Sequence, residues 1–274
     1  MLTTVEGTPI HVDIYSSTTS TSMEDDALVV SPKELVRYAC KRKNFAIKDV
    51  LLPPAVVLAA PSFIDIFGDR FLIEEVEKTV INNHYRVGGM DVALIQSRTG
   101  GPAMALDLEV MITLSASIFV HVGFAGGLHS DLNPGDIIIS RGALTETGIP
   151  PLYGFREPLV PSDPWLTNSL IGCALRKIVP IRSGVHWCTD APYREKKGEI
   201  SRYTNEGALC VEMEGSALFA VSKSYKAHAA AVYVVSDVIT EEGWRQTWYT
   251  EEMLKGCRKA VELVGSFVQE YDAK

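Results

Sequence analysis

The stretch Gly207-Ala-Leu-Cys-Val-Glu-Met-Glu-Gly-Ser-Ala-Leu-Phe219 places two carboxylates where a short apolar run becomes a helical pattern. Leu209 and Val211 are typical of the end of a buried strand, and the apolar residues that follow repeat at helical spacing. Residues i and i+2 of a strand share a face, so we expect Glu212 and Glu214 to reach into one cleft. Such a pair suits the binding of vicinal hydroxyl groups on a polyol. From spacing alone the alternative stays open that the pair only begins a helix, favoured by the helix dipole.

Length and composition indicate a globular protein with one core. The 274 residues are 46% apolar and 22% charged, and the chain carries a formal charge of −8. This acidic balance argues against nucleic acids and anionic membranes as partners, and no apolar run approaches the roughly 20 residues of a membrane span. The five cysteines and six histidines are scattered singly, without the spacing of a metal site. We therefore expect free thiols in a cytoplasmic compartment, no metal and no cofactor.

The first 27 residues are interpreted as a polar N-terminal extension. They are rich in serine and threonine, and they lack a basic region followed by an apolar block, which argues against a secretory signal. From residue 28 to residue 274, no linker or shift in composition divides the chain. We expect this part to form a single α/β domain.

Apolar runs alternate with helical patterns along that domain. Such alternation predicts a mainly parallel or mixed sheet that is covered on both faces, with ligands at the carboxyl ends of its strands. Strands are expected over residues 55–60, 91–95, 118–122, 136–140, 183–187, 208–212 and 229–236. Helices are expected over residues 32–43, around 70–83, from 100–102 to about 114, and from about 246 onward.

Polar and glycine-rich segments stand at the ends of several predicted strands. Gln96-Ser-Arg-Thr-Gly-Gly101 leads into a helix, so its backbone N–H groups are able to hold an anion, although it matches neither a P-loop nor a dinucleotide fingerprint. Gly123-Phe-Ala-Gly-Gly-Leu128 is a second such turn. Asp237 ends an apolar strand, where a partly desolvated carboxyl group can act as a general acid, with Arg245 close by to position the proton. The alternative is that Asp237 caps a following turn.

Together these segments resemble the nucleoside phosphorylase and nucleosidase superfamily, which includes purine nucleoside and uridine phosphorylases and methylthioadenosine nucleosidases. The resemblance covers roughly residues 55 to 270, and the order and spacing of the motifs are more specific than any one motif. It implies a three-layer α/β/α sandwich around a twisted mixed sheet, and a homodimer or homohexamer. The matching segments are Thr99-Gly-Gly-Pro102 with Glu109, Val122–Leu128, Pro134-Gly-Asp136, Thr189-Asp-Ala-Pro-Tyr193, Val211–Leu218 and Val234-Val-Ser-Asp237.

The resemblance also implies an activity and roles for single residues. The activity is that of a pentosyltransferase, which cleaves the N-glycosidic bond of a nucleoside and transfers the ribosyl group to phosphate as co-substrate. Asp237 is expected to donate to a ring nitrogen of the leaving base, and Trp187 or Tyr193 to stack on that base. The residues assigned to the ribose are Glu212, Met213 and Glu214.

The part of the family pattern that binds phosphate is absent. Where family phosphorylases carry Gly-Asp-Pro-x-Arg after the first strand, this chain has Ala60-Pro-Ser-Phe-Ile64, and where they carry Arg-x-Gly-Ser/Thr it has His121-Val-Gly-Phe124. A dianionic phosphate without arginine partners is costly to bury. The residues left in the phosphate or nucleophile region are Arg98, Thr99, Gly100 and His121, with Arg70, Arg86 or Lys78 of a neighbouring subunit as further anion ligands.

Three functions therefore stay open, with the phosphorylase leading. In the second, water is the nucleophile, as in nucleosidases, which use a glutamate soon after the first strand where only Asp65 is close here. The third is a nucleoside-binding or storage protein without turnover, against which the retention of the ribose and base residues argues. A uracil base loses support because Lys196 and Gly198 stand near the places where uridine phosphorylases carry glutamine and arginine. Asp237 favours a purine.

Overall fold

The computed structural model describes residues 28–81 and 83–272, and from Pro32 onward these form one compact unit. The predicted extension of residues 1–27 lies outside the described residues, so the domain boundary after residue 27 stays a prediction. Within the described part of the chain, no helix is both long and apolar enough to cross a membrane.

One mixed sheet of eleven strands runs through this unit, in the order β11-β10-β6-β8-β9-β5-β1-β4-β3-β2, with β7 paired to β6. Because β10 also pairs with β5, the strands β5, β10, β6, β8 and β9 close into a ring. The strands are β1 (Ala55–Ala59), β2 (Ile73–Glu75), β3 (His84–Val87), β4 (Val92–Gln96), β5 (Ile118–Gly127), β6 (Ile137–Thr145), β7 (Leu159–Pro161), β8 (Arg182–Cys188), β9 (Ala208–Glu212), β10 (His228–Thr240) and β11 (Gly243–Arg245).

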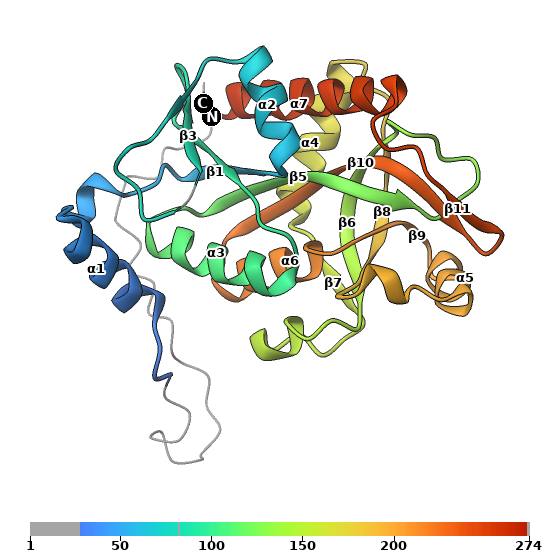
Figure 1. Cartoon of the computed structure of the whole chain (residues 1–274), viewed down its shortest axis with the longest axis horizontal. Coiled ribbons are helices and arrows are strands. Elements are labelled where there is room, and N and C mark those ends of the chain that lie inside the picture. The colour runs from blue at the N-terminus through green and yellow to red at the C-terminus, as the bar shows by residue number, and fades with distance from the viewer. Residues whose placement is uncertain (1–27, 82, 273–274) are drawn as a thin grey trace, which may run out of the picture. The chain divides into compact units, whose positions relative to one another are not determined.

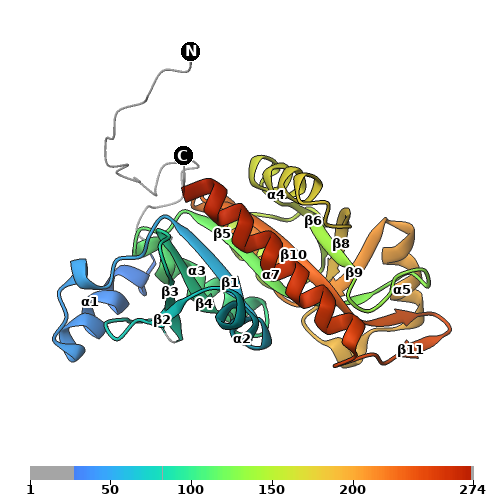
Figure 2. The same ribbon diagram turned by 90° about the horizontal axis from the view of Figure 1, so that it is seen from above.

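Helices cover both faces of the sheet (Figures 1 and 2). One apolar cluster contains residues of α1, α3 and α6, and a second contains residues of α2, α4 and α7. The helices are α1 (Pro32–Lys43), α2 (Pro61–Arg70), α3 (Gly101–Thr113), α4 (Pro164–Arg176), α5 (Lys197–Asn205), α6 (Gly215–Ser224) and α7 (Glu251–Asp272), with short 3-10 turns at Ile47–Asp49, Pro150–Tyr153 and Pro192–Arg194. The predicted α/β class with a mixed central sheet is confirmed.

Strand β1 shows why the central strands are apolar throughout. Its side chains alternate between the two faces of the sheet, so Val56 and Leu58 join the first cluster while Val57 and Ala59 join the second. Both faces are buried under helices, and each position therefore requires an apolar residue.

Two segments differ from the predicted elements. The helix expected around residues 70–83 lies earlier, over Pro61–Arg70, because Pro61 occupies the first turn, where its missing N–H costs nothing. The next residues are extended instead, and Ile73 pairs with Val87 in β2 and β3. The predicted glycine turn at residues 123–128 largely continues β5, since its glycines leave room for facing side chains: a Cβ atom on Gly126 would lie 2.8 Å from Ile239 Cδ1.

Candidate active site

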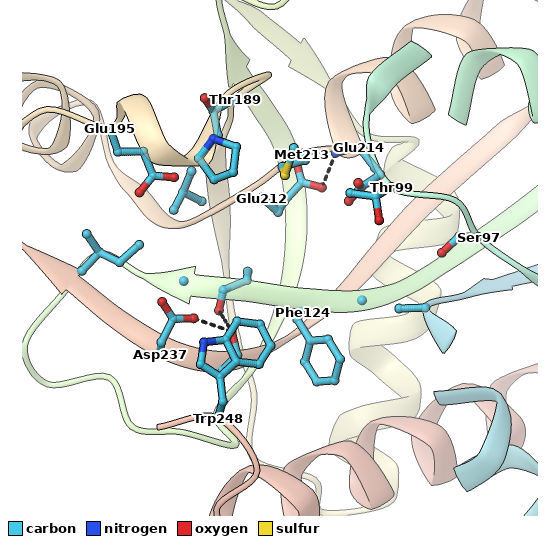
Figure 3. A pocket seen from close by; sticks show the side chains of 18 of the residues that line it. Ser97, Thr99, Phe124, Thr189, Glu195, Glu212, Met213, Glu214, Asp237 and Trp248 are labelled. Carbon is cyan, nitrogen blue, oxygen red and sulfur yellow. Dashed lines mark hydrogen bonds between the residues drawn. The ribbon is translucent and has the colours of Figure 1, made fainter. Parts of the chain in front are cut away.

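One cavity of about 680 Å³ opens at the edge of the sheet where several strands end. Its wall includes residues that follow β1, β4 and β8, the end of β9 with the two residues after it, parts of β5, β10 and β11, and Trp248. We call Glu195, Glu214 and Asp237 the carboxylate wall, and Phe124 and Trp248 the aromatic wall. In Figure 3, Glu195 and Asp237 lie toward one side of the cavity, Glu214 lies toward the other, and the aromatic wall lies below them. Strands β1, β4, β5 and β10 run in one direction, and β8 and β9 run in the opposite one. The pairing of Val211 with Gly126 brings the end of β9 to the carboxyl-terminal half of β5.

Glu214 immediately precedes the first residue of α6. Its Oε1 accepts a hydrogen bond of 2.5 Å from the backbone N–H of Gly100, which joins the segment after β9 to the start of α3. Burial, and then the charge of the neighbouring Glu212, raises the pKa of Glu214 to about 8. Met213 and Thr99 stand beside it in the cavity wall. A carboxyl group in this place is able to accept hydrogen bonds from two adjacent hydroxyl groups.

Glu212 is the last residue of β9, and both of its carboxylate oxygens already have partners. Oε2 accepts from the backbone N–H of Glu214 at 2.9 Å, and the N–H of Gly215 lies 3.0 and 2.9 Å from Oε1 and Oε2. His186 Nε2 lies 2.9 Å from Oε1, without the alignment of a hydrogen bond. Burial acts to raise the pKa of Glu212, but His186 and the backbone N–H groups outweigh it and hold that pKa below its usual range.

Both glutamates line the cavity, as the sequence predicts, but they do so in different ways. The strand ends at Glu212, so the two side chains do not share a strand face. Glu214 lines the cavity beside Thr99. Glu212 is only 5% exposed, and its carboxylate accepts from the backbone N–H groups of Glu214 and Gly215, so it also orients the backbone that carries Glu214. This arrangement also admits no side chain at Gly215, where a Cβ atom would lie 2.5 Å from His186 Nε2 and 2.6 Å from the Tyr233 hydroxyl oxygen.

Asp237 and Ser236 both line the cavity although they are neighbours in β10. The pairing of β10 with β5 shifts by one residue between Val235 and Asp237, and such a bulge interrupts the alternation of side chains. Ser236 Oγ donates to Asp237 Oδ1 at 2.5 Å, and Trp244 Nε1 donates to Oδ2 at 2.6 Å. Since Asp237 is only 5% exposed, these two bonds hold its carboxylate in one orientation at the cavity wall.

Arg245 and Trp187 lie outside the cavity, which corrects their predicted roles. Arg245 Nη2 donates to the backbone carbonyl of Leu132 at 2.6 Å. In the hairpin of β10 and β11 it is the neighbouring Trp244 that reaches Asp237. Trp187 is buried and stacked on Tyr203, with ring centroids 4.5 Å apart, because its place in β8 turns it toward α5.

Of the residues predicted to contact a base, Tyr193 does line the cavity, with 93% of its surface exposed. Three further residues line the cavity that were not predicted from the sequence: Glu195, Trp244 and Trp248. Trp244 and Trp248 could have been predicted, because two tryptophans follow soon after the strand that ends in Ser236 and Asp237. Glu195 offers none, because a charged residue in a polar loop is ordinary.

The segments that replace the phosphate motifs meet at the aromatic wall. Phe63, from the first segment, is fully buried behind Phe124, from the second, with 4.8 Å between their ring centroids. Phe124 in turn lies 5.6 Å from Trp248, edge to face. Tilted and edge-on rings of this kind pack well together but offer no charge to an anion.

The cationic groups predicted near the nucleophile are neutral or already paired. Burial lowers the pKa of His121 to about 4, a shift that Glu212 opposes and His186 reinforces, so its ring is uncharged near pH 7. Arg98 lines the cavity, but its Nε and Nη2 donate to Asp107 at 2.9 and 2.5 Å.

The other groups considered for the nucleophile region do not line the cavity: Asp65, Arg70, Lys78 and Arg86. Arg70 lies 2.8 Å from Glu262, and Lys78, which was considered as part of a neighbouring subunit, lies 3.3 Å from Asp49 of its own chain. Among the residues that the structure describes, no three His, Cys, Asp or Glu side chains are grouped to hold a metal ion.

Comparison with known proteins shows which proteins this chain resembles. The chain is 27% identical over 187 residues to a guanosine phosphorylase of Halorubrum lacusprofundi, covering 66% of this chain and 76% of the relative. It is 30% identical over 189 residues to a uridine phosphorylase of Treponema pallidum, covering 63% and 73%. A crystal structure of purine nucleoside phosphorylase from Toxoplasma gondii in complex with immucillin-H superposes with a TM-score of 0.74 at 17% identity, covering 84% of this chain and 94% of that one.

These relatives are named for different bases, so their names do not assign one to this chain. They agree on the fold and on the class of enzyme, which is that of nucleoside phosphorylases, as the sequence predicted. The model of the phosphorylase superfamily matches residues 65–271. By that match, which spans most of its length, this chain belongs to the phosphorylase superfamily.

Proposed function

We propose that the protein cleaves the N-glycosidic bond of a nucleoside by ribosyl transfer. The observation that carries this proposal is the placement of Glu214 and Asp237 in one cavity, each oriented by donors that the fold supplies. A nucleoside has two parts that differ in chemistry, a polyol and a heterocycle. A hydroxyl-binding carboxyl group at one side and a second carboxyl group at the other match those two parts.

The proposed roles follow from how charge develops as the bond breaks. The ribosyl group gains positive charge and the leaving base gains negative charge, so groups placed for the transition state accelerate the reaction. Glu214, with Met213 beside it, binds the ribose hydroxyl groups. In the empty site it is largely protonated near pH 7, and the hydroxyl donors and the developing sugar cation favour its carboxylate, which stabilises that cation. Asp237 faces the base and supplies a proton to a ring nitrogen. Glu212 acts through Glu214 and is a positioning residue.

Phosphate is the acceptor that the family relationship favours, because the relatives are named as phosphorylases. Water is a second candidate, and one observation favours it. His121 and Arg98, the residues of cationic type among the described residues that line the cavity, are respectively uncharged near pH 7 and bound to Asp107. A buried dianion without such partners is unfavourable, whereas water needs none.

A product assay tests the proposal. The protein is incubated with guanosine, inosine, adenosine and uridine, with phosphate and in phosphate-free buffer, and the base and sugar products are identified by chromatography. Release of the base with ribose 1-phosphate supports phosphorolysis, and free ribose without phosphate supports hydrolysis. If nucleosides bind but no base is released under either condition, the protein is a binding protein and the proposed activity is wrong.

A further inference from the structure

His186 is a buried residue to which the proposed reaction gives no part. It lies in β8, is 0% exposed, and does not line the cavity. Both of its ring nitrogens have polar neighbours: Nε2 lies 2.9 Å from Glu212 Oε1, and Nδ1 lies 2.7 Å from Ser140 Oγ. An imidazole ring without access to water is costly to place unless such contacts offset its desolvation.

The position of Ser140 results from a bulge in β6. The pairing of β6 with β8 shifts by one residue between Ser140 and Gly142, and such a bulge interrupts the alternation of side chains. Ser140 Oγ also accepts a hydrogen bond of 3.1 Å from the backbone N–H of Gly142. Because the hydroxyl group is fixed in this way, it holds the ring of His186 in one orientation.

These contacts decide which nitrogen of His186 carries a proton. If Ser140 Oγ donates to Nδ1, the proton of a neutral ring is on Nε2. If Nδ1 donates instead, Nε2 must carry a second proton, because a bare ring nitrogen 2.9 Å from a carboxylate oxygen would be repelled. In both cases the nitrogen next to Glu212 is protonated. The contact lacks the alignment of a hydrogen bond, so it acts mainly through electrostatic attraction.

Glu212 has five other titratable groups around it, from several elements: His121 (β5), Cys188 (β8), Cys210 (β9), Tyr233 (β10) and Glu214 (before α6). Burial raises the pKa of both thiols and of the tyrosine hydroxyl group well above the usual values, and it lowers the pKa of His121 to about 4. These four groups are therefore neutral near pH 7. Burial also acts to raise the pKa of Glu212, and His186 is the largest of the effects that lower it.

We propose that His186 is a positioning residue for the sugar site, which holds the Glu212 carboxylate against the backbone N–H groups at the start of α6 and so fixes Glu214. Glu212 accepts from the N–H groups of Glu214 and Gly215, so a change that moves or neutralises Glu212 also loosens the segment that carries Glu214. The inference rests on the proposed function for the role of Glu214, but it gives a part to a residue outside the cavity.

Two replacements of His186 test the proposal. His186→Leu removes both polar contacts, while His186→Gln keeps an amide donor near the place of Nε2. If His186 only fills space, leucine is the better replacement at this buried position. If it positions Glu212, we expect kcat/KM to fall roughly 10- to 100-fold in His186→Leu and clearly less in His186→Gln. Ser140→Ala removes only the partner of Nδ1 and should give a smaller loss of the same kind.

The pH profile of kcat/KM distinguishes positioning from a merely structural role. In the wild type, burial and then the charge of Glu212 raise the pKa of Glu214 to about 8. Without His186, the buried Glu212 favours its protonated form, its repulsion of Glu214 is lost, and the pKa of Glu214 falls. The acidic limb of the profile should therefore move to lower pH, by roughly half a pH unit or more, in both His186→Leu and Glu212→Gln. In a protein that already carries Glu212→Gln, His186→Leu should cause no further shift.

His84→Gln is the matched control, because His84 is also buried and has an Nε2 without a partner, but it lies in β3 and does not line the cavity. It should leave the acidic limb unchanged. Thermal melts confirm that each variant is folded, and His186→Gln with Ser140→Ala carries the same comparison if His186→Leu does not fold. An acidic limb that stays at the wild-type pH in the folded variants, or a leucine variant as active as the glutamine variant, overturns the proposal.

Binding keeps the test independent of turnover. Trp244 and Trp248 line the cavity, so the binding of inosine can be followed by tryptophan fluorescence even in a protein that cleaves nothing. Affinity for inosine should rise as Glu214 ionises, and the pH midpoint of this rise should be lower in His186→Leu than in the wild type. That result supports the inference although the proposed activity fails. Cleavage of nucleosides with an unshifted midpoint supports the activity and refutes the inference.

Discussion

The carboxylate wall and the aromatic wall of the cavity are built in different ways. In the carboxylate wall, Glu214 follows the end of β9 and accepts a hydrogen bond from the backbone N–H of Gly100. Asp237 lies at the bulge of β10 and accepts from Ser236 and Trp244. The aromatic wall continues the apolar core instead, since Phe124 packs on the fully buried Phe63. One wall is an oriented set of charges, and the other is a hydrophobic surface.

The contrast between the two walls indicates that this cavity suits the sugar and the base of a nucleoside better than it suits an anionic acceptor. In the proposed reaction the carboxylates of this wall stabilise a sugar that becomes cationic, and Asp237 supplies a proton to the leaving base. The same negative charge repels a dianionic acceptor, and the aromatic rings give such an anion no partner. The proteins named as phosphorylases share the fold with this chain, but the fold alone does not decide how an acceptor is bound.

The largest effect is expected at Glu214. At a pH above about 8, where Glu214 is ionised, replacing it with glutamine removes the charge that stabilises the ribosyl cation and should lower kcat/KM for the best nucleoside about 100-fold or more. Steady-state kinetics on purified protein measure this, with Glu206→Gln, at the exposed end of α5, as the control. If Glu214→Gln retains nearly the full rate, the carboxylate wall is not the part of the cavity that acts on the sugar.

A loss of similar or slightly smaller size is expected for Asp237→Asn. Asparagine can still accept from Trp244 but cannot supply a proton, and general acid catalysis typically contributes about 100-fold or more. The control is Arg245→Ala, because Arg245 binds the carbonyl of Leu132 outside the cavity and should change the rate less than about twofold. A large effect of Arg245→Ala with none of Asp237→Asn would reverse the assignment of roles.

The aromatic wall can be probed with two variants of Phe124. Phe124→Ser and Phe124→Ala open similar space, but only serine adds a hydroxyl donor toward an anion. We expect the KM for phosphate to be roughly three- to tenfold lower in the serine variant than in the alanine variant. If the wild type already binds phosphate tightly and neither change matters, the acceptor lies elsewhere and the contrast between the two walls has no functional meaning.

The smallest effect concerns stability. The pKa of Glu214 is raised in the folded state, so folding favours its protonated form, and stability falls as the pH rises from the unfolded value toward about 8. Glutamine mimics the neutral form, so Glu214→Gln should melt roughly 2 °C or more above the wild type at pH 8.5, with little difference near pH 4.5. Thermal scans across that range measure the difference. A gap that does not depend on pH would contradict the raised pKa.

The features that the sequence predicts well are those that depend on the order of residues. The change from apolar strand to helix at residues 208–224 and the strand that carries Ser236 and Asp237 follow from periodicity alone. Periodicity does not bring Glu214 and Asp237 together, because β9 runs antiparallel to β5 and β10. Their placement in one site was predicted from the family resemblance, which the order and spacing of the motifs carry.

The features that the sequence does not predict depend on pairing between distant strands. Whether Trp187 or Trp244 faces the cavity is decided by the register of β8 and by the hairpin of β10 and β11. The position of the buried Glu212 carboxylate beside His186 depends on the exact end of β9. Local patterns contain no information on these pairings, because a shift of one residue reverses every side chain.

The bulge at Ser236 has a consequence for how this protein tolerates genetic change. A substitution alters one side chain, but the loss or gain of a single residue between Val235 and Asp237 would exchange the two faces of the rest of β10. The ladder with β5 would become regular while Asp237 left the cavity, so an in-frame deletion of one codon could produce a strand that pairs better and an enzyme that does nothing. Sequence libraries made by substitution alone would never sample that outcome.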